Sequence, residues 1–159
     1  MLVAVGLAVS AGVVAGVVIL AGSGGGSGSA GPAPVESKLF VVGANDSRQP
    51  LENGGTVDVG ALSLLIRFSD FPGKVKSGME IAVTDKATGA PVKGANLVVL
   101  PTMPMPEMFK GFMHLQGIES APGRFDLNWQ LPMPSWWTLF VEVTSAGSTS
   151  STELFVSLS

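Results

Sequence analysis

The chain has 159 residues, a formal net charge of −3 at pH 7, a single histidine and no cysteine. The lack of cysteine excludes disulfide bonds, thiolate nucleophiles and thiolate metal sites. Because the charge balance is mildly acidic, we expect no nucleic-acid partner. The single histidine and the absence of a G-x-S-x-G or P-loop motif leave few routes to a nucleophile and its base, so we expect a protein that is not an enzyme.

The first predicted element is an apolar segment, residues 1–22, which carries no charged side chain. As a helix it would be roughly 30 Å long, which matches the hydrocarbon core of a bilayer. A cleaved signal peptide is the alternative, with a small-residue cleavage site around Gly28-Ser29-Ala30. However, no basic residue precedes the apolar segment, which is also longer than a usual signal core. We therefore predict a retained transmembrane helix surrounded by membrane lipid.

Small residues recur every four positions in this segment, at Ala4, Ala8, Gly12 and Gly16. On a helix they form one flat stripe, which allows a second helix to approach closely in lipid. The stripe predicts a helix-packing interface with other transmembrane helices of a larger membrane protein complex. Small residues are also common by chance in a segment rich in Ala, Gly and Val, so both interpretations stay open.

The remaining chain divides into a tether and a domain. Residues 23–35 are rich in Gly, Ser and Pro and predict a linker about 20 Å across. Residues 36–159 contain short β-rich segments separated by turn residues, which is typical of an all-β sandwich of about seven to eight strands. We expect strands near residues 39–42, 62–68, 79–84, 95–100, 111–116, 124–130, 137–144 and 152–158.

The tryptophan positions predict which of these rings lie in the core and which lie at the surface. Trp129 shares one face of its predicted strand with Phe125 and Leu127, so we expect it in the core. Trp136 and Trp137 are neighbours and would point to opposite faces of a strand. At least one of these two residues is therefore a candidate for contact with a partner, and the alternative is a ring that covers the open end of the sandwich.

Methionines concentrate in two Met-Pro segments. Residues 103–133 contain five of the seven methionines, and both Met-Pro segments would emerge at the same end of the sandwich if the strands between them alternate in direction. Thioethers and an imidazole together favour Cu(I). The predicted ligands are Met105, Met108, Met133 and His114.

Methionine is equally a flexible core filler and a component of adaptable binding surfaces, so this alternative to a copper site also stands. Met113 and His114 would point to opposite faces of one strand, so we do not expect both in one site.

Several of these segments together resemble a known family. Residues 84–95, 103–108, 122–125, 131–133 and 136–139 are similar in order and spacing to the FixH and YtkA-like group of extracytoplasmic immunoglobulin-like domains, over about residues 79–144. The resemblance implies an immunoglobulin-like sandwich. It also implies a periplasmic domain with a cytoplasmic N-terminus, in a bacterial inner membrane. Here Pro134-Ser135 replace the glycines that the family usually has between its last Met and its Trp.

The family is associated with membrane respiratory assemblies, notably cytochrome oxidase maturation, and with copper handling. We therefore expect an accessory subunit that docks onto a larger bioenergetic membrane complex, of respiratory oxidase or photosynthetic reaction centre type. The alternative is a membrane-anchored Cu(I) chaperone that uses the Met-Pro loops. Apart from Cu(I), we expect no cofactor.

Overall fold

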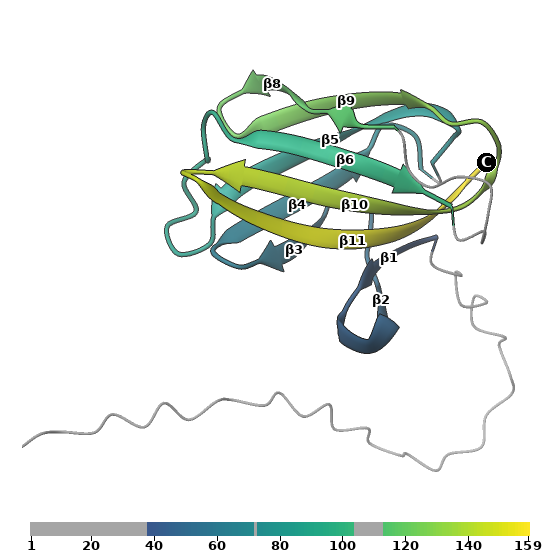
Figure 1. Ribbon diagram of the computed structural model, residues 1–159, viewed down its shortest axis with the longest axis horizontal. Coiled ribbons are helices and arrows are strands. Elements are labelled where there is room, and N and C mark those ends of the chain that lie inside the picture. Colours follow the sequence, from purple (N-terminus) through teal and green to yellow (C-terminus); the bar gives the residue numbers. More distant parts are fainter. Residues whose placement is uncertain (1–37, 72, 104–112) are drawn as a thin grey trace, which may run out of the picture. The chain divides into compact units, whose positions relative to one another are not determined.

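The structure is a computed structural model that describes residues 38–71, 73–103 and 113–159. In these ranges the chain forms two antiparallel sheets that pack as a β-sandwich (Figure 1). Sheet A has the order β2-β1-β11-β10-β6-β7, and sheet B has the order β3-β4-β5-β9-β8. The described strands belong to one compact unit, Val35–Ser159. The prediction of an all-β sandwich is confirmed.

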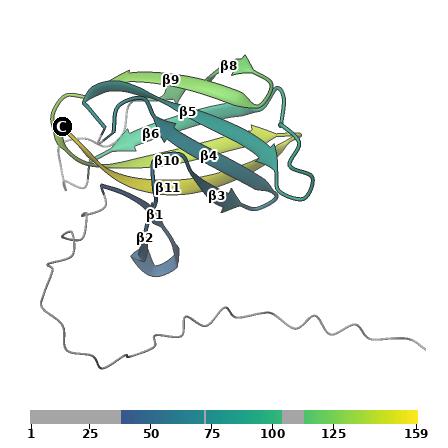
Figure 2. The same ribbon diagram turned by 180° about the vertical axis from the view of Figure 1, so that it is seen from behind.

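The strands of sheet A are β1 (Leu39–Val42), β2 (Arg48–Pro50), β6 (Asn96–Thr102), β7 (Leu115–Gln116), β10 (Ser135–Ser145) and β11 (Ser148–Leu158). Those of sheet B are β3 (Gly55–Val59), β4 (Leu62–Phe68), β5 (Lys76–Asp85), β8 (Ile118–Ala121) and β9 (Arg124–Gln130). A short 3-10 segment, η1 (Ala44–Asp46), connects β1 to β2. The reverse view in Figure 2 shows β4 and β5 of sheet B.

Each of the eight predicted strands corresponds to an observed one, and the bounds of β1, β4 and β9 agree with the prediction. The predicted number of strands is too low, because the described residues form 11 strands. The three additional strands are β2, β3 and β8. Every residue of β2 and β8 is exposed, so neither has the apolar alternation that identifies a half-buried strand. The signal for β3 was present in Val57 and Val59, which alternate with Thr56 and Asp58.

Alternating side chains from both sheets form the core. In β9 every second residue is buried, and Trp129 is only 5% exposed, as predicted. Its indole packs edge-on against Phe68, with ring centroids 5.8 Å apart, and its N–H donates to the carbonyl of Lys74 at 3.1 Å. This hydrogen bond satisfies the one polar atom that the buried ring carries.

The N-terminal predictions fall outside the described residues. They are the transmembrane helix over residues 1–22, its stripe of Ala4, Ala8, Gly12 and Gly16, and the linker over residues 23–35. Within the ranges that the structure describes, no helix has the length and apolar character needed to cross a bilayer. The membrane anchor therefore stays a prediction.

Candidate functional site

Met103 and Met133, the described methionines of the two Met-Pro segments, lie at the same end of sheet A. Thr102 at the end of β6 pairs with Thr138 near the start of β10. Met103 follows β6 and Met133 precedes β10, so both residues lie at this end of the sheet. His114 precedes β7, whose Leu115 pairs with Val99 in the middle of β6. The strand register thus places Met133 at this end of the sandwich and His114 beside the middle of β6. Met105 and Met108 lie outside the described residues.

The side chains at this end differ in exposure. Met103 is 7% exposed and belongs to the core, whereas Met133 is 38% exposed. Met113 packs against the core and its neighbour His114 is exposed, as expected for adjacent residues. Met133 offers an exposed thioether and His114 an exposed imidazole, and each of these groups suits Cu(I). In the described parts of the chain no cluster of three or more His, Cys, Asp or Glu side chains forms a metal site. The copper site stays a prediction.

Trp137 holds the second Met-Pro segment in place. Its ring is 2% exposed, and its indole N–H donates to the carbonyl of Met133 at 3.3 Å. Trp137 is therefore a core residue in this structure, and of the two tryptophans predicted as partner contacts only Trp136 reaches the surface. The alternation of neighbouring residues indicated opposite faces but not which of the two rings would be buried.

Trp136 belongs to an aromatic cluster on the outer face of sheet A, formed by Phe40, Arg48, Trp136 and Phe155. The Trp136 and Phe155 rings are stacked, with centroids 4.8 Å apart and an interplanar angle of 7°. Phe40 lies 6.1 Å from Trp136, and the guanidinium carbon of Arg48 lies 3.6 Å above the Phe155 ring. Stacking and cation–π contacts of this kind each stabilise a pair by about 0.5–1.5 kcal/mol. Phe155 is only 8% exposed and Phe40 and Trp136 are half-buried, so the cluster is preformed and presents part of its rings at the surface.

Sequence reasoning missed three of the four cluster residues. Phe40 and Phe155 are directly opposite each other in the pairing of β1 with β11. Arg48 comes from β2, which pairs with the other edge of β1. Only the register between distant strands brings these side chains together, and no local pattern contains that information.

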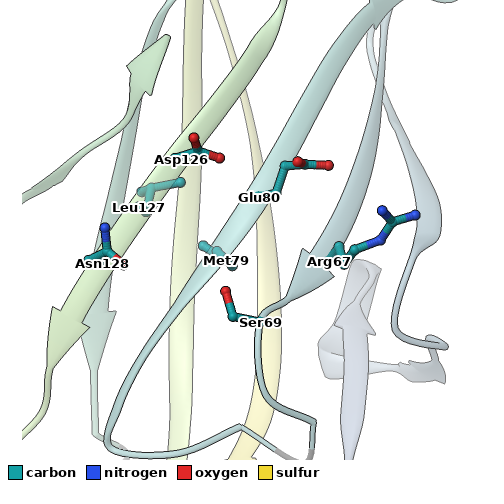
Figure 3. A pocket seen from close by; sticks show the side chains of 7 residues that line it. All are labelled: Arg67, Ser69, Met79, Glu80, Asp126, Leu127 and Asn128. Atoms are coloured by element: carbon teal, nitrogen blue, oxygen red, sulfur yellow. The ribbon is translucent and has the colours of Figure 1, made fainter. Parts of the chain in front are cut away.

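The outer face of sheet B is polar and slightly hollowed. Figure 3 shows Arg67, Glu80 and Asp126 on three neighbouring strands, at a surface depression of about 380 Å³. The depression is lined by Arg67, Ser69, Met79, Glu80, Asp126, Leu127 and Asn128. Glu80 forms an ion pair with Arg124 at 3.6 Å. These contacts are typical of a solvated sheet face.

Gly78 allows the chain to pack closely beside this depression. A Cβ at position 78 would lie 2.6 Å from the Leu127 carbonyl oxygen and 2.7 Å from Asn128 Oδ1. The position therefore requires glycine for close approach of β5 and β9.

Comparison with known proteins identifies one family. Neither the curated proteins nor the solved structures include a match to this chain. The model of the family described as YtkA-like matches residues 65–142, which extend from β4 into β10. The matched region contains both strands that border the Met-Pro segments, β6 and β10, and overlaps most of the region whose sequence resembles the family. The resemblance to the YtkA-like family is therefore confirmed over residues 65–142.

Proposed function

We propose that this chain is a non-enzymatic, single-span accessory subunit that docks onto a larger bioenergetic membrane complex and stabilises it or helps to assemble it. The observation that carries the proposal is the aromatic cluster on the outer face of sheet A. Outward-facing positions of an antiparallel sheet are polar where that face meets only water. An aromatic cluster on such a face marks a surface that contacts another protein or the membrane in which the complex lies.

Two further features support this function. The stripe of Ala4, Ala8, Gly12 and Gly16 suits close packing against another transmembrane helix. The YtkA-like resemblance implies a respiratory oxidase as the complex, and a photosynthetic reaction centre is a second bioenergetic assembly of the same general kind. In this proposal the N-terminus lies in the cytoplasm of a bacterium and the sandwich lies on the periplasmic side of its inner membrane.

The strand order supports an immunoglobulin-like assignment for the sandwich. In sheet B the sequence β4-β5-β9-β8 corresponds to strands A, B, E and D of an immunoglobulin domain. In sheet A the sequence β6-β10-β11 corresponds to strands C, F and G. Strands β1, β2 and β3 would then be additions at the N-terminal side of this framework.

The proposal is tested by extracting the native membrane with mild detergent and separating the extract on a native gel. We expect the chain to migrate with a large complex. Replacing two stripe residues, Gly12→Leu with Gly16→Leu, should release the chain from that complex, because larger side chains prevent close helix approach. The matched control, Val14→Leu with Val18→Leu, alters the opposite side of the helix and should leave the complex intact.

Migration of the unaltered chain as a free monomer would contradict the proposed function. Retention of the stripe variant in the complex would show that the helix does not dock through these residues.

Binding of Cu(I) by the Met-Pro loops, as in a membrane-anchored copper chaperone, is a second candidate function. One specific observation favours it, namely the register that places Met103 and Met133 at the same end of sheet A. The exposed thioether of Met133 and imidazole of His114 are suitable Cu(I) ligands.

A further inference from the structure

The outward-facing side chains of sheet A change from aromatic to polar along the strands. Outward-facing residues form rows across the sheet, and the register defines each row. The row nearest the Met-Pro end contains Trp136 and Ser157. The second row is Phe40, Phe155, Thr138 and Thr102. The third row is Val42, Glu153, Phe140 and Leu100, of which Phe140 is 37% exposed.

Polar residues replace apolar ones in the rows nearer the β10–β11 turn. The fourth row is Ser151, Glu142, Val98 and Gln116, and the fifth is Thr149, Thr144 and Asn96. The rings of Phe40, Trp136 and Phe155 therefore lie toward the Met-Pro end, whereas Arg48 and Glu153 share the third row and Glu142 lies in the fourth. One sheet face thus has an aromatic end and a polar end.

The predicted tether joins the domain at the aromatic end. Strand β1 begins at Leu39, and its second residue, Phe40, is already part of the aromatic cluster. The carbonyl of Lys38 accepts a hydrogen bond from Ser157, which is the neighbour of Trp136 in the first row. Residues 23–37 between the apolar segment and the domain would span only about 20 Å as a flexible chain. A membrane anchor would therefore keep this end of sheet A close to the bilayer.

We propose that the aromatic end of sheet A rests against the bilayer surface, with Trp136 at the level of the lipid headgroups. This inference rests on the membrane anchor of the proposed function and specifies what covers the aromatic cluster. Tryptophan is enriched at membrane interfaces because its ring is apolar and its N–H can meet water or headgroups. The guanidinium of Arg48, which lies over the Phe155 ring, adds attraction to anionic lipid.

Fluorescence of the full chain in lipid vesicles tests this contact. The vesicles contain phosphatidylcholine and phosphatidylglycerol, with or without bromine on the acyl chains. Because Trp129 and Trp137 are 5% and 2% exposed, quenching by bromine should act on Trp136. We expect brominated vesicles to lower the emission, and the variant Trp136→Phe to lose most of that difference. Unquenched emission in the unaltered chain would overturn the inference.

Site-directed labelling provides a second measurement on one strand. Because the chain has no cysteine, single variants such as Ser157→Cys and Thr149→Cys can be labelled cleanly with a nitroxide. Both positions face outward on β11, in the first and fifth rows. We expect the label at 157 to be accessible to membrane-dissolved oxygen and the label at 149 to be accessible to a water-soluble relaxation agent. Equal access at both positions would contradict the proposal.

A separate control distinguishes failure of the anchor from failure of the inference. The reconstituted chain is washed with alkaline carbonate and floated with its vesicles. If the chain does not float, the membrane anchor fails and the inference fails with it. If the chain floats but Trp136 is not quenched, the anchor stands and lipid does not cover the cluster. Crosslinking of floated chains through position 157 would then identify a second copy as the occupant.

Discussion

Asn53 shows how one side chain extends the pairing of two strands. Its amide oxygen accepts from the Phe68 N–H at 2.6 Å and its amide nitrogen donates to the Phe68 carbonyl at 3.2 Å. Regular pairing of β3 with β4 begins two residues later, where Gly55 faces Ile66. The side chain therefore satisfies both backbone groups of Phe68 at the end of β4.

We expect Asn53→Ala to lower the free energy of unfolding by about 1–3 kcal/mol, because it leaves part-buried backbone groups without partners. The measurement is urea unfolding of the purified chain. Gln49→Ala, at an exposed position of β2, is the control and should change stability by less than about 0.5 kcal/mol. Equal effects of the two substitutions would mean that the Phe68 contacts contribute little.

The neighbouring tryptophans should respond differently to truncation. Trp137 is 2% exposed and hydrogen-bonded to Met133. Trp137→Ala should therefore lower the free energy of unfolding by about 3–5 kcal/mol, because it leaves a cavity in the core. Trp136 is half-buried on the outer face, and Trp136→Ala should cost about 1 kcal/mol, mainly the loss of stacking on Phe155. Similar losses for both variants in urea unfolding would contradict the burial assigned to them.

At the scale of elements, the β10–β11 turn is under conformational strain. Ser145 pairs with Ser148, which leaves Ala146 and Gly147 as a two-residue loop with φ of 50° and 78°. This loop has the positive φ values of a type I′ turn, which favours Asn-Gly because most other side chains clash there. We expect Ala146→Asn to raise the free energy of unfolding by about 0.5–1 kcal/mol. Ala146→Val is the contrast and should destabilise the hairpin, because a β-branched residue tolerates positive φ poorly.

The turn that follows β5 depends on a charged carboxylate. Asp85 Oδ1 accepts from the Thr88 hydroxyl at 2.8 Å and from the backbone N–H groups of Thr88 and Ala87. These hydrogen bonds, the Thr88 hydroxyl first, lower the pKa of Asp85. Nearby, hydrogen bonds from Lys86 and then Ser63 lower the pKa of Asp58, whose carboxylate lies 2.9 Å from the Lys86 ammonium. The ionised carboxylates are thus favoured in the folded state.

Because each carboxyl group has a lower pKa in the folded state, its ionisation stabilises the fold at pH values above the ordinary Asp pKa of about 3.9. This stabilisation is lost as the pH falls toward the pKa of the folded state. We therefore expect the urea midpoint to fall as the solution is acidified below about pH 4. Asp85→Asn retains an acceptor oxygen but does not titrate, so its midpoint should fall less steeply with acid. An identical acid profile in the variant would exclude Asp85 as a contributor.

At the scale of the whole molecule, the strand register decides which loops can share a ligand. Met103 follows β6 and Met133 precedes β10, and the pairing of Thr102 with Thr138 brings these two residues to one end of the sheet.

If the Met-Pro loops bind copper, the full chain in detergent should take up about one equivalent of Cu(I). Met105→Leu together with Met133→Leu should abolish that uptake. Met79→Leu alters a methionine that is only 2% exposed in the core, and this control should bind as the unaltered chain does. Unchanged uptake in the double variant would rule out these ligands.

Local alternation was sufficient to predict several parts of this protein. It identified the bounds of β4 and β9 and the burial of Trp129. These features depend on which residues of one strand face the core, and that periodicity is contained in the strand itself. The YtkA-like region was likewise recognisable from the order and spacing of its short segments.

The aromatic cluster, by contrast, depends on tertiary structure. Its residues come from β1, β2, β10 and β11, which are distant in sequence. A one-residue shift in register would turn the outward side chains of a strand inward, so the cluster exists only through the pairing of whole strands. Sequence alone therefore determined the fold class and the burial of individual strands. The choice between Trp136 and Trp137 as the surface ring was made by packing, because only the assembled sandwich defines which face of β10 is the core.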